Sequence, residues 1–168
     1  RLPVLRMMLQ ELSPLVDQEP LAGLALCDAL WDERVLEFRY LASMLLGQVP
    51  SAHSNEIISR VKKWLTADLD FSLVEYVMEH SLNKMRSDQP GIVLELIANW
   101  LEERELFFRQ LGLRALLPLI KIPGFQNIPA FFRLIQPLVQ SVPSGLHPDL
   151  LDVSASLAQR FPQETAFF

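Results

Sequence analysis

The feature that most constrains this chain is a pair of helices that recurs along it. Breaks rich in Pro, Gly, Asn and Asp separate helix-length segments, which alternate between a first and a second helix. First helices are predicted to begin near Leu21, Asn55, Pro90 and Pro129, and second helices near Glu33, Ser72, Leu106 and Pro148. Successive first helices are therefore 34, 35 and 39 residues apart. A two-helix unit of this period predicts an α-solenoid.

Within the segments, apolar residues recur every three or four positions. One such series consists of Leu36, Tyr40, Leu41, Met44 and Leu45, which would lie on one face of an α-helix. No segment alternates convincingly between apolar and polar residues as a half-buried strand does. The sequence therefore predicts an all-α fold.

The three tryptophans fall at equivalent places, near the ends of the predicted first helices. Trp31, Trp64 and Trp100 each precede the turn into a second helix. A large ring at such a place is suited to fill the junction between stacked units. Because the small-residue consensus that packs TPR helices is missing, the pattern favours HEAT-like repeats with an indole at each junction.

Local sequence supports several of the predicted helix starts. Pro90 and Pro148 suit first helical positions, where a missing N–H costs no hydrogen bond. Ser72 and Glu75 have the spacing of a capping box. In "TADLD", Asp68 and Asp70 are predicted to serve turns and caps, because the spacing of a calcium loop and its closing Glu are missing.

Length and charge bound the kinds of function that remain. The 168 residues suit one domain, residues 1–168, or the ordered part of a longer protein. The net charge of −5 argues against a generic polyanion binder. Residues 1–105 carry 10 basic and 17 acidic side chains, whereas 106–168 carry 5 and 3. Any nucleic-acid contact is therefore expected to favour the later half.

Several classes of site have no counterpart in the sequence. The single cysteine, Cys27, lies among apolar neighbours and is predicted to be buried, in a reducing compartment. No His or Cys spacing for metal, no Gly-rich phosphate loop and no nucleophile elbow occurs. No apolar run reaches the roughly eighteen residues that a bilayer span needs. We expect a cytoplasmic monomer with no cofactor, no metal and no membrane contact.

Three stretches together resemble a known family: "LWDERVLEFRYLASMLL", "WLTADLDFSLVEYVMEHSL" and "IANWLEERELFFRQLGLRALLPL". Their succession is similar to the HEAT-like repeats of the DNA alkylation repair glycosylases, the AlkD-like family. The resemblance runs from about Leu30 to Leu119, with a weaker echo in "LLDVSASLAQRFPQETAFF". It implies that the chain binds DNA on a concave helical surface and releases cationic alkylated purines without pulling the base into a pocket.

In that family an Asp stabilises positive charge growing on the sugar, two Trp pack against the deoxyribose and backbone, and an Arg holds a phosphate. Carried over to this chain, the Trp-x-x-x-Asp element falls on "FSLVE", which places Phe71 at the Trp and Glu75 at the Asp. The phosphate-binding Arg falls on Gln110, with Arg109 beside it. No Trp follows Trp100, so the second sugar-packing Trp has no counterpart.

Each of these positions also has a plainer interpretation. Glu75 would belong to the capping box, and Phe71 would cover the core at a helix entry. Arg104 would pair with acids on a helix surface. Four further basic residues would be surface charges rather than phosphate contacts: Arg109, Arg114, Lys121 and Arg133. The apolar run from Ala130 to Phe132 would be buried between repeats rather than exposed for a partner.

We therefore expect a non-catalytic HEAT-repeat scaffold that binds a protein or DNA on its concave face. The alternative is an alkylpurine DNA glycosylase that uses the carboxylate of Glu75. A third hypothesis, DNA binding without excision, lies between the two. The candidate binding residues are Phe71, Arg109, Gln110 and Arg114, with Glu75 as the candidate catalytic residue.

Overall fold

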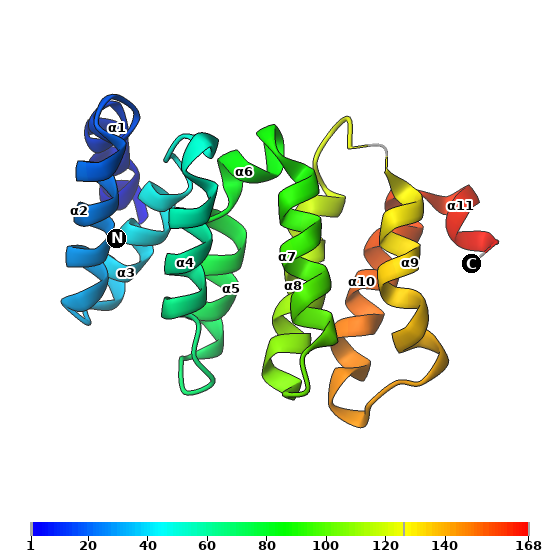
Figure 1. Ribbon diagram of the computed structural model, residues 1–168. Coiled ribbons are helices and arrows are strands. Elements are labelled where there is room, and N and C mark those ends of the chain that lie inside the picture. The colour runs from blue at the N-terminus through cyan, green and yellow to red at the C-terminus, as the bar shows by residue number, and fades with distance from the viewer. Residues whose placement is uncertain (1, 126, 168) are drawn as a thin grey trace. The chain divides into compact units, whose positions relative to one another are not determined.

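Helix pairs account for most of the chain. The computed structural model describes residues 2–125 and 127–167, without the side chain of Leu2. The described residues form α-helices and two short 3₁₀ turns, and include no β-strand (Figure 1). They divide into two units, one up to Gln89 and one from Pro90, and each unit is described by itself.

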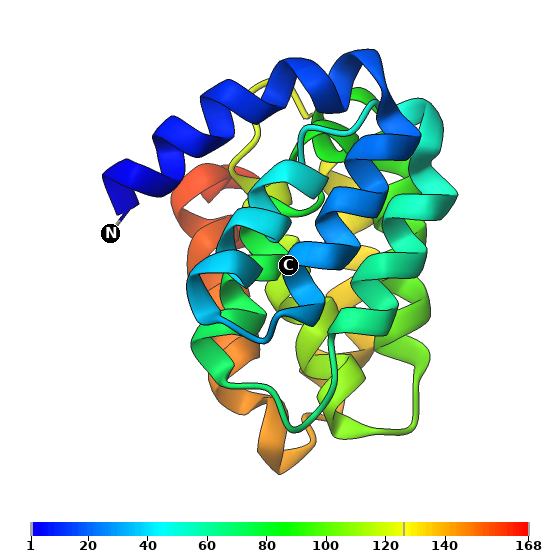
Figure 2. The same cartoon turned by 90° about the vertical axis from the view of Figure 1, so that its left-hand side faces the viewer.

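The first unit contains six α-helices within its described residues. Its elements are α1 (Leu2–Gln18), α2 (Pro20–Asp32), α3 (Leu36–Leu46), η1 (Ser51–His53), α4 (Ser54–Trp64), α5 (Phe71–His80) and α6 (Asn83–Asp88). The first helix of one pair, α2, packs against α3 and against the next first helix, α4, while α3 packs against α5. First helices and second helices therefore form two layers, with apolar side chains such as Leu24, Leu41, Leu45 and Val77 buried in the unit. α1 contacts both α2 and α3, and α2 follows the end of α1 with its axis at a steep angle to that of α1 (Figure 2).

An indole pair joins the two first helices of this unit. Trp31 near the end of α2 and Trp64 at the end of α4 stack with centroids 4.4 Å apart and an interplanar angle of 4°. Both rings are buried, as is Trp100 in the second unit. For Trp31 and Trp64, the predicted position of indoles at a junction between helix pairs is confirmed.

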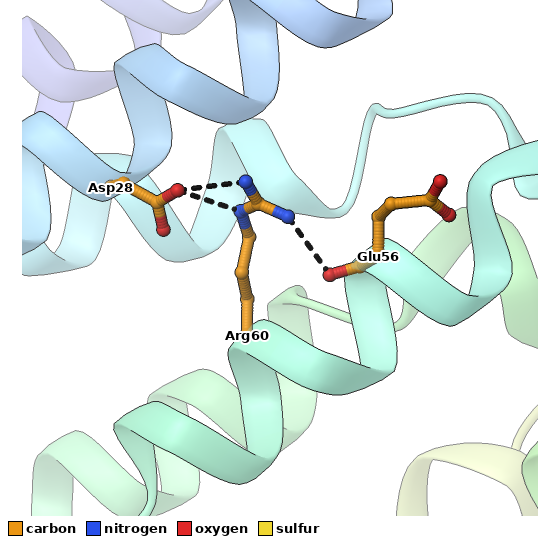
Figure 3. A network of polar contacts seen from close by, with 3 residues as sticks. All are labelled: Asp28, Glu56 and Arg60. Carbon is orange, nitrogen blue, oxygen red and sulfur yellow. Dashed lines mark hydrogen bonds and ion pairs between the residues drawn. The ribbon is translucent and has the colours of Figure 1, made fainter.

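A polar bridge supports the same junction about one turn earlier along both helices (Figure 3). The guanidinium of Arg60 on α4 donates from Nη2 and Nε to one carboxylate oxygen of Asp28 on α2, at 2.7 and 3.1 Å. Its Nη1 donates to the carbonyl of Glu56, at 3.1 Å. Beside Asp28, Cys27 is fully buried as predicted, and burial raises the pKa of its thiol to about 12. Such a thiol is inert as a nucleophile.

A buried arginine holds α6 against the end of α5. Arg86 donates from Nη1 to the carbonyl of Met78 at 2.8 Å, and from Nη2 to the carbonyl of Glu79. These carbonyls belong to the last turn of α5, where no further helical N–H follows. Burial lowers the pKa of Arg86 to about 10, which still leaves the side chain charged near neutral pH.

The second unit repeats the pattern. Its elements are α7 (Pro90–Glu102), α8 (Leu106–Ile120), α9 (Ile128–Gln140), η2 (Ser144–Leu146), α10 (His147–Arg160) and α11 (Pro162–Ala166). α8 packs against both α7 and α10, and α9 and α11 pack against α10. At Gly112 the backbone of α8 approaches α7 so closely that an added Cβ would lie 2.7 Å from a methyl group of Leu101.

The predicted helix starts agree with the structure to within three residues. The first helices begin at Pro20, Ser54, Pro90 and Ile128, and the second helices at Leu36, Phe71, Leu106 and His147. The prediction of an all-α helical-repeat fold is confirmed. A single residue, Glu19, separates α1 from α2, and the short helix α6 was not among the predicted helices.

Candidate functional site

The two candidate residues of the first unit lie on α5, one turn apart. Phe71 is the first residue of the helix, and Glu75 follows four positions later, so both lie on the same face. Phe71 is 54% exposed, and Glu75 is exposed as well. The prediction that Phe71 covers the core is therefore wrong, because the ring at the helix entry faces solvent.

The capping box predicted for Ser72 and Glu75 is also wrong. α5 begins at Phe71, so its N-cap is Asp70, whose carboxylate accepts hydrogen bonds from the backbone N–H of Ser72, at 2.9 Å, and from the Ser72 hydroxyl. Glu75 thus lies two positions beyond the third helical residue that a capping box uses. A hydrogen bond from the Thr66 hydroxyl lowers the pKa of Asp68, and those from Ser72 lower the pKa of Asp70. The predicted turn and cap roles of these two aspartates are confirmed.

Three half-buried rings continue along the second-helix layer next to Glu75. Tyr76 on α5 lies between Tyr40 of α3 and His80, with centroid distances of 4.2 Å to each. Burial raises the pKa of Tyr76 and lowers the pKa of His80. The histidine is thus favoured in its neutral form, as part of an aromatic cluster.

In the second unit, Gln110 and Arg114 both point from α8 toward the start of α10. Nε2 of Gln110 donates to the carbonyl of Gly145 at 3.3 Å. Nη2 of Arg114 lies 2.6 Å from the carboxylate of Asp149, and the two side chains are 16% and 5% exposed. Burial raises the pKa of Asp149, against the opposing effect of Arg114. Both candidate phosphate-binding side chains therefore make contacts within the fold.

The other basic residues considered as candidates have separate environments. Arg109 donates from Nε to the carbonyl of Glu103 at 2.7 Å. Arg104 lies in the link between α7 and α8, so pairing at helical spacing does not apply to it. Lys121 and Arg133 are exposed. A phosphate contact by any of these side chains stays a prediction.

The apolar run from Ala130 to Phe132 lies at the start of α9. Phe131 is fully buried, as predicted, against Phe125 and Phe161. Phe132 is half-buried and lines an open groove of about 620 Å³. The other residues along this groove are Ile128, Pro129, Arg133, Gln136, Val139, Gln140, Glu164 and Phe167.

A second pocket, in the first unit, was not anticipated from the sequence. It has a volume of about 540 Å³ and lies where the turn from α2 to α3 meets the turn from α4 to α5. Three cationic side chains line it: Arg34, Arg39 and Lys63. They come from the α2–α3 turn, from α3 and from α4, so no local sequence motif indicates the pocket. Arg34 and Arg39 both lie in the stretch "LWDERVLEFRYLASMLL", but nothing in the sequence connects them with Lys63.

Among the described residues, neither unit contains a cluster of metal ligands or a helix that could cross a membrane. No group of three or more His, Cys, Asp or Glu side chains is placed to hold a metal ion. No described helix combines the length and apolar character that crossing a bilayer requires. Chemically, the described candidates provide one exposed aromatic and carboxylate pair on α5 and one cation-lined pocket in the first unit. In the second unit, the side chains of Gln110 and Arg114 on α8 already make contacts within the fold.

The chain is similar to a known protein family. The family model described as DNA alkylation repair enzyme matches residues 1–143, which is most of the chain. No curated protein and no solved structure matches it. The resemblance inferred from the repeats is thereby confirmed, and the chain belongs to the DNA alkylation repair enzyme family.

Proposed function

We propose that this chain is a helical-repeat binding protein that has lost base excision. The observation that carries the proposal is the ion pair between Arg114 and Asp149. A guanidinium 2.6 Å from a buried carboxylate has its charge compensated inside the fold, and moving it to a phosphate would leave Asp149 buried without that compensation.

The neighbouring position on the same helix supports the proposal. Gln110 stands where the resemblance implies the phosphate-binding Arg, and its amide donates to the Gly145 carbonyl rather than facing solvent alone. On α5, Glu75 replaces the implied Asp, and its extra methylene would displace the carboxylate by roughly an ångström. A displacement of that size can cost about a hundredfold in rate. The family's skeleton is retained while the positions for chemistry differ.

Base release from methylated duplex DNA tests the proposal. Purified protein is incubated with DNA carrying 3-methyladenine and 7-methylguanine, and the free bases are quantified by chromatography against a reaction without protein. We expect no release above the spontaneous rate. Release that grows with protein concentration would overturn the proposal.

The second candidate is an alkylpurine glycosylase that acts through Glu75. It is favoured by the exposure of Phe71 and Glu75 on one face of α5, where an aromatic ring and a carboxylate are presented together. If the protein releases base, Glu75→Gln should abolish release. Glu79→Gln, an exposed carboxylate one turn further along the same helix, should leave release unchanged. Equal activity of the two variants would remove Glu75 from the chemistry.

Binding is tested separately, because a scaffold must have a partner. The proposed partner is DNA or a protein. Fluorescence anisotropy with a labelled duplex measures affinity across a range of salt concentrations. DNA bound through phosphates should lose affinity steeply with salt, because the contacts release counterions. No binding at low salt would leave a protein partner as the proposal.

A further inference from the structure

We propose that the pocket between the α2–α3 and α4–α5 turns of the first unit binds a phosphoryl group through Arg34, Arg39 and Lys63. This site lies on another helix pair than Arg109, Gln110 and Arg114, and it does not depend on whether the protein excises bases. The three cations line one pocket of about 540 Å³. Guanidinium groups suit phosphate because they donate two parallel N–H bonds to its oxygens.

Arg39 is held in place by the indole pair. Its Nε donates to the carbonyl of Trp31 at 3.3 Å, and its guanidinium carbon lies 4.9 Å from the centroid of the Trp31 ring. Trp31 in turn stacks on Trp64. The side chain therefore loses little further freedom when it contacts an anion, which favours binding.

Arg34 has an unusual backbone conformation. Its φ of 58° is in the left-handed region, where a residue other than Gly is strained. Glycine would fit this turn without strain, so the structural requirement of the turn does not account for an arginine. A cation at the wall of the pocket gives the residue a role that Gly cannot fill.

Two aspartates also line the pocket, and both are engaged in their own loop. Asp70 caps α5 through Ser72, and Asp68 accepts a hydrogen bond from Thr66 that lowers the pKa of its carboxyl, with a smaller contribution from the charge of Arg39. These contacts shape the wall formed by residues 65–70. The three cations still exceed the two carboxylates by one positive charge.

Lys63 and Lys62 provide a matched pair for the test. Both are exposed and lie side by side in the last turn of α4, and only Lys63 lines the pocket. Lys63→Gln and Lys62→Gln remove the same charge from the same helix. Arg34→Gly removes a second cation of the pocket and relieves the strained φ, so this variant should fold.

The experiment titrates the full chain with inorganic phosphate and follows arginine Nε and backbone amide signals by NMR. Saturable shifts should appear in residues around the pocket. Lys63→Gln and Arg34→Gly should each weaken phosphate binding several-fold, up to roughly tenfold for one charge-assisted contact. Lys62→Gln should leave the affinity within about twofold, as expected for a charge outside the pocket. Absence of saturable shifts, or equal effects of the two lysine variants, would overturn the proposal.

Competition then identifies the source of the phosphoryl group. If unlabelled duplex DNA displaces the phosphate-induced shifts, the group belongs to a nucleic-acid backbone. If a deoxynucleoside monophosphate displaces them and DNA does not, the site takes a small phosphorylated ligand. Both results support the pocket, and neither depends on base release.

Discussion

Gly47 lies where the end of α3 meets the end of α5, and no other residue fits there. A Cβ added to Gly47 would lie 2.0 Å from the carbonyl oxygen of His80 and 3.1 Å from its carbonyl carbon. The carbonyl of Gly47 also accepts a hydrogen bond from the backbone N–H of Lys84, at 3.2 Å. Because both contacts involve backbone, a side chain cannot be accommodated by a rotamer change. One missing methyl group thus sets the separation of two second helices.

Gly47→Ala should therefore destabilise the protein by at least about 2 kcal/mol, in the range of substitutions that overpack a core. Urea unfolding followed by far-UV circular dichroism measures the change. The control is Gly91→Ala, because a Cβ at Gly91 meets nothing within 4 Å. Alanine there should be neutral or stabilising by up to about 1 kcal/mol. Similar losses for the two variants would contradict the close approach at Gly47.

At the scale of helices, the sequence predicted most starts because apolar periodicity and Pro, Gly and Asp breaks are local signals. The start of α5 shows the limit: Ser72 and Glu75 match a capping box, yet Asp70 caps the helix from two residues earlier. α6 was missed because tertiary contacts of Arg86, rather than local propensity, hold it. The cation-lined pocket was missed for a related reason, since its walls come from segments that only the fold brings together.

Substitution of the α5 cap tests this corrected start. Asp70→Ala should lower the melting temperature, because it leaves the backbone N–H of Ser72 without its side-chain acceptor. Glu75→Ala should change it less, since Glu75 is exposed and does not complete a capping box. The loss from Asp70→Ala should itself diminish as the pH falls through the usual carboxyl range. The pKa of Asp70 is lowered in the folded protein, so the stabilising effect of its carboxylate is present above that range and lost below it. A larger fall in melting temperature for Glu75→Ala than for Asp70→Ala would instead support the capping box.

At the scale of the whole chain, each of the two units has its own tie between successive helix pairs, made by side-chain contacts. In the first unit the indole stack and the bridge from Arg60 to Asp28 join α2 to α4. In the second unit Arg114 and Gln110 fix α8 to the segment that begins α10. Helical repeats contact chiefly their neighbours, so their stability is close to a sum of local terms. Damage to one tie should therefore be felt mainly in its own unit.

Asp149→Asn tests this locality, because it removes the charge that compensates Arg114 with little change of shape. Arg114 is partly exposed, so we expect a loss of about 2 kcal/mol, below that of breaking a fully buried pair. Native-state hydrogen exchange should show faster opening of α8 and α10 and nearly unchanged protection of α2 and α3. Asp152 is an exposed carboxylate on the same helix, so Asp152→Asn should change neither the stability nor the hydrogen exchange of α8 and α10. Equal loss of protection in both units would instead mean that the tie in α8 stabilises the chain as one cooperative structure, and the local account of its stability would fail.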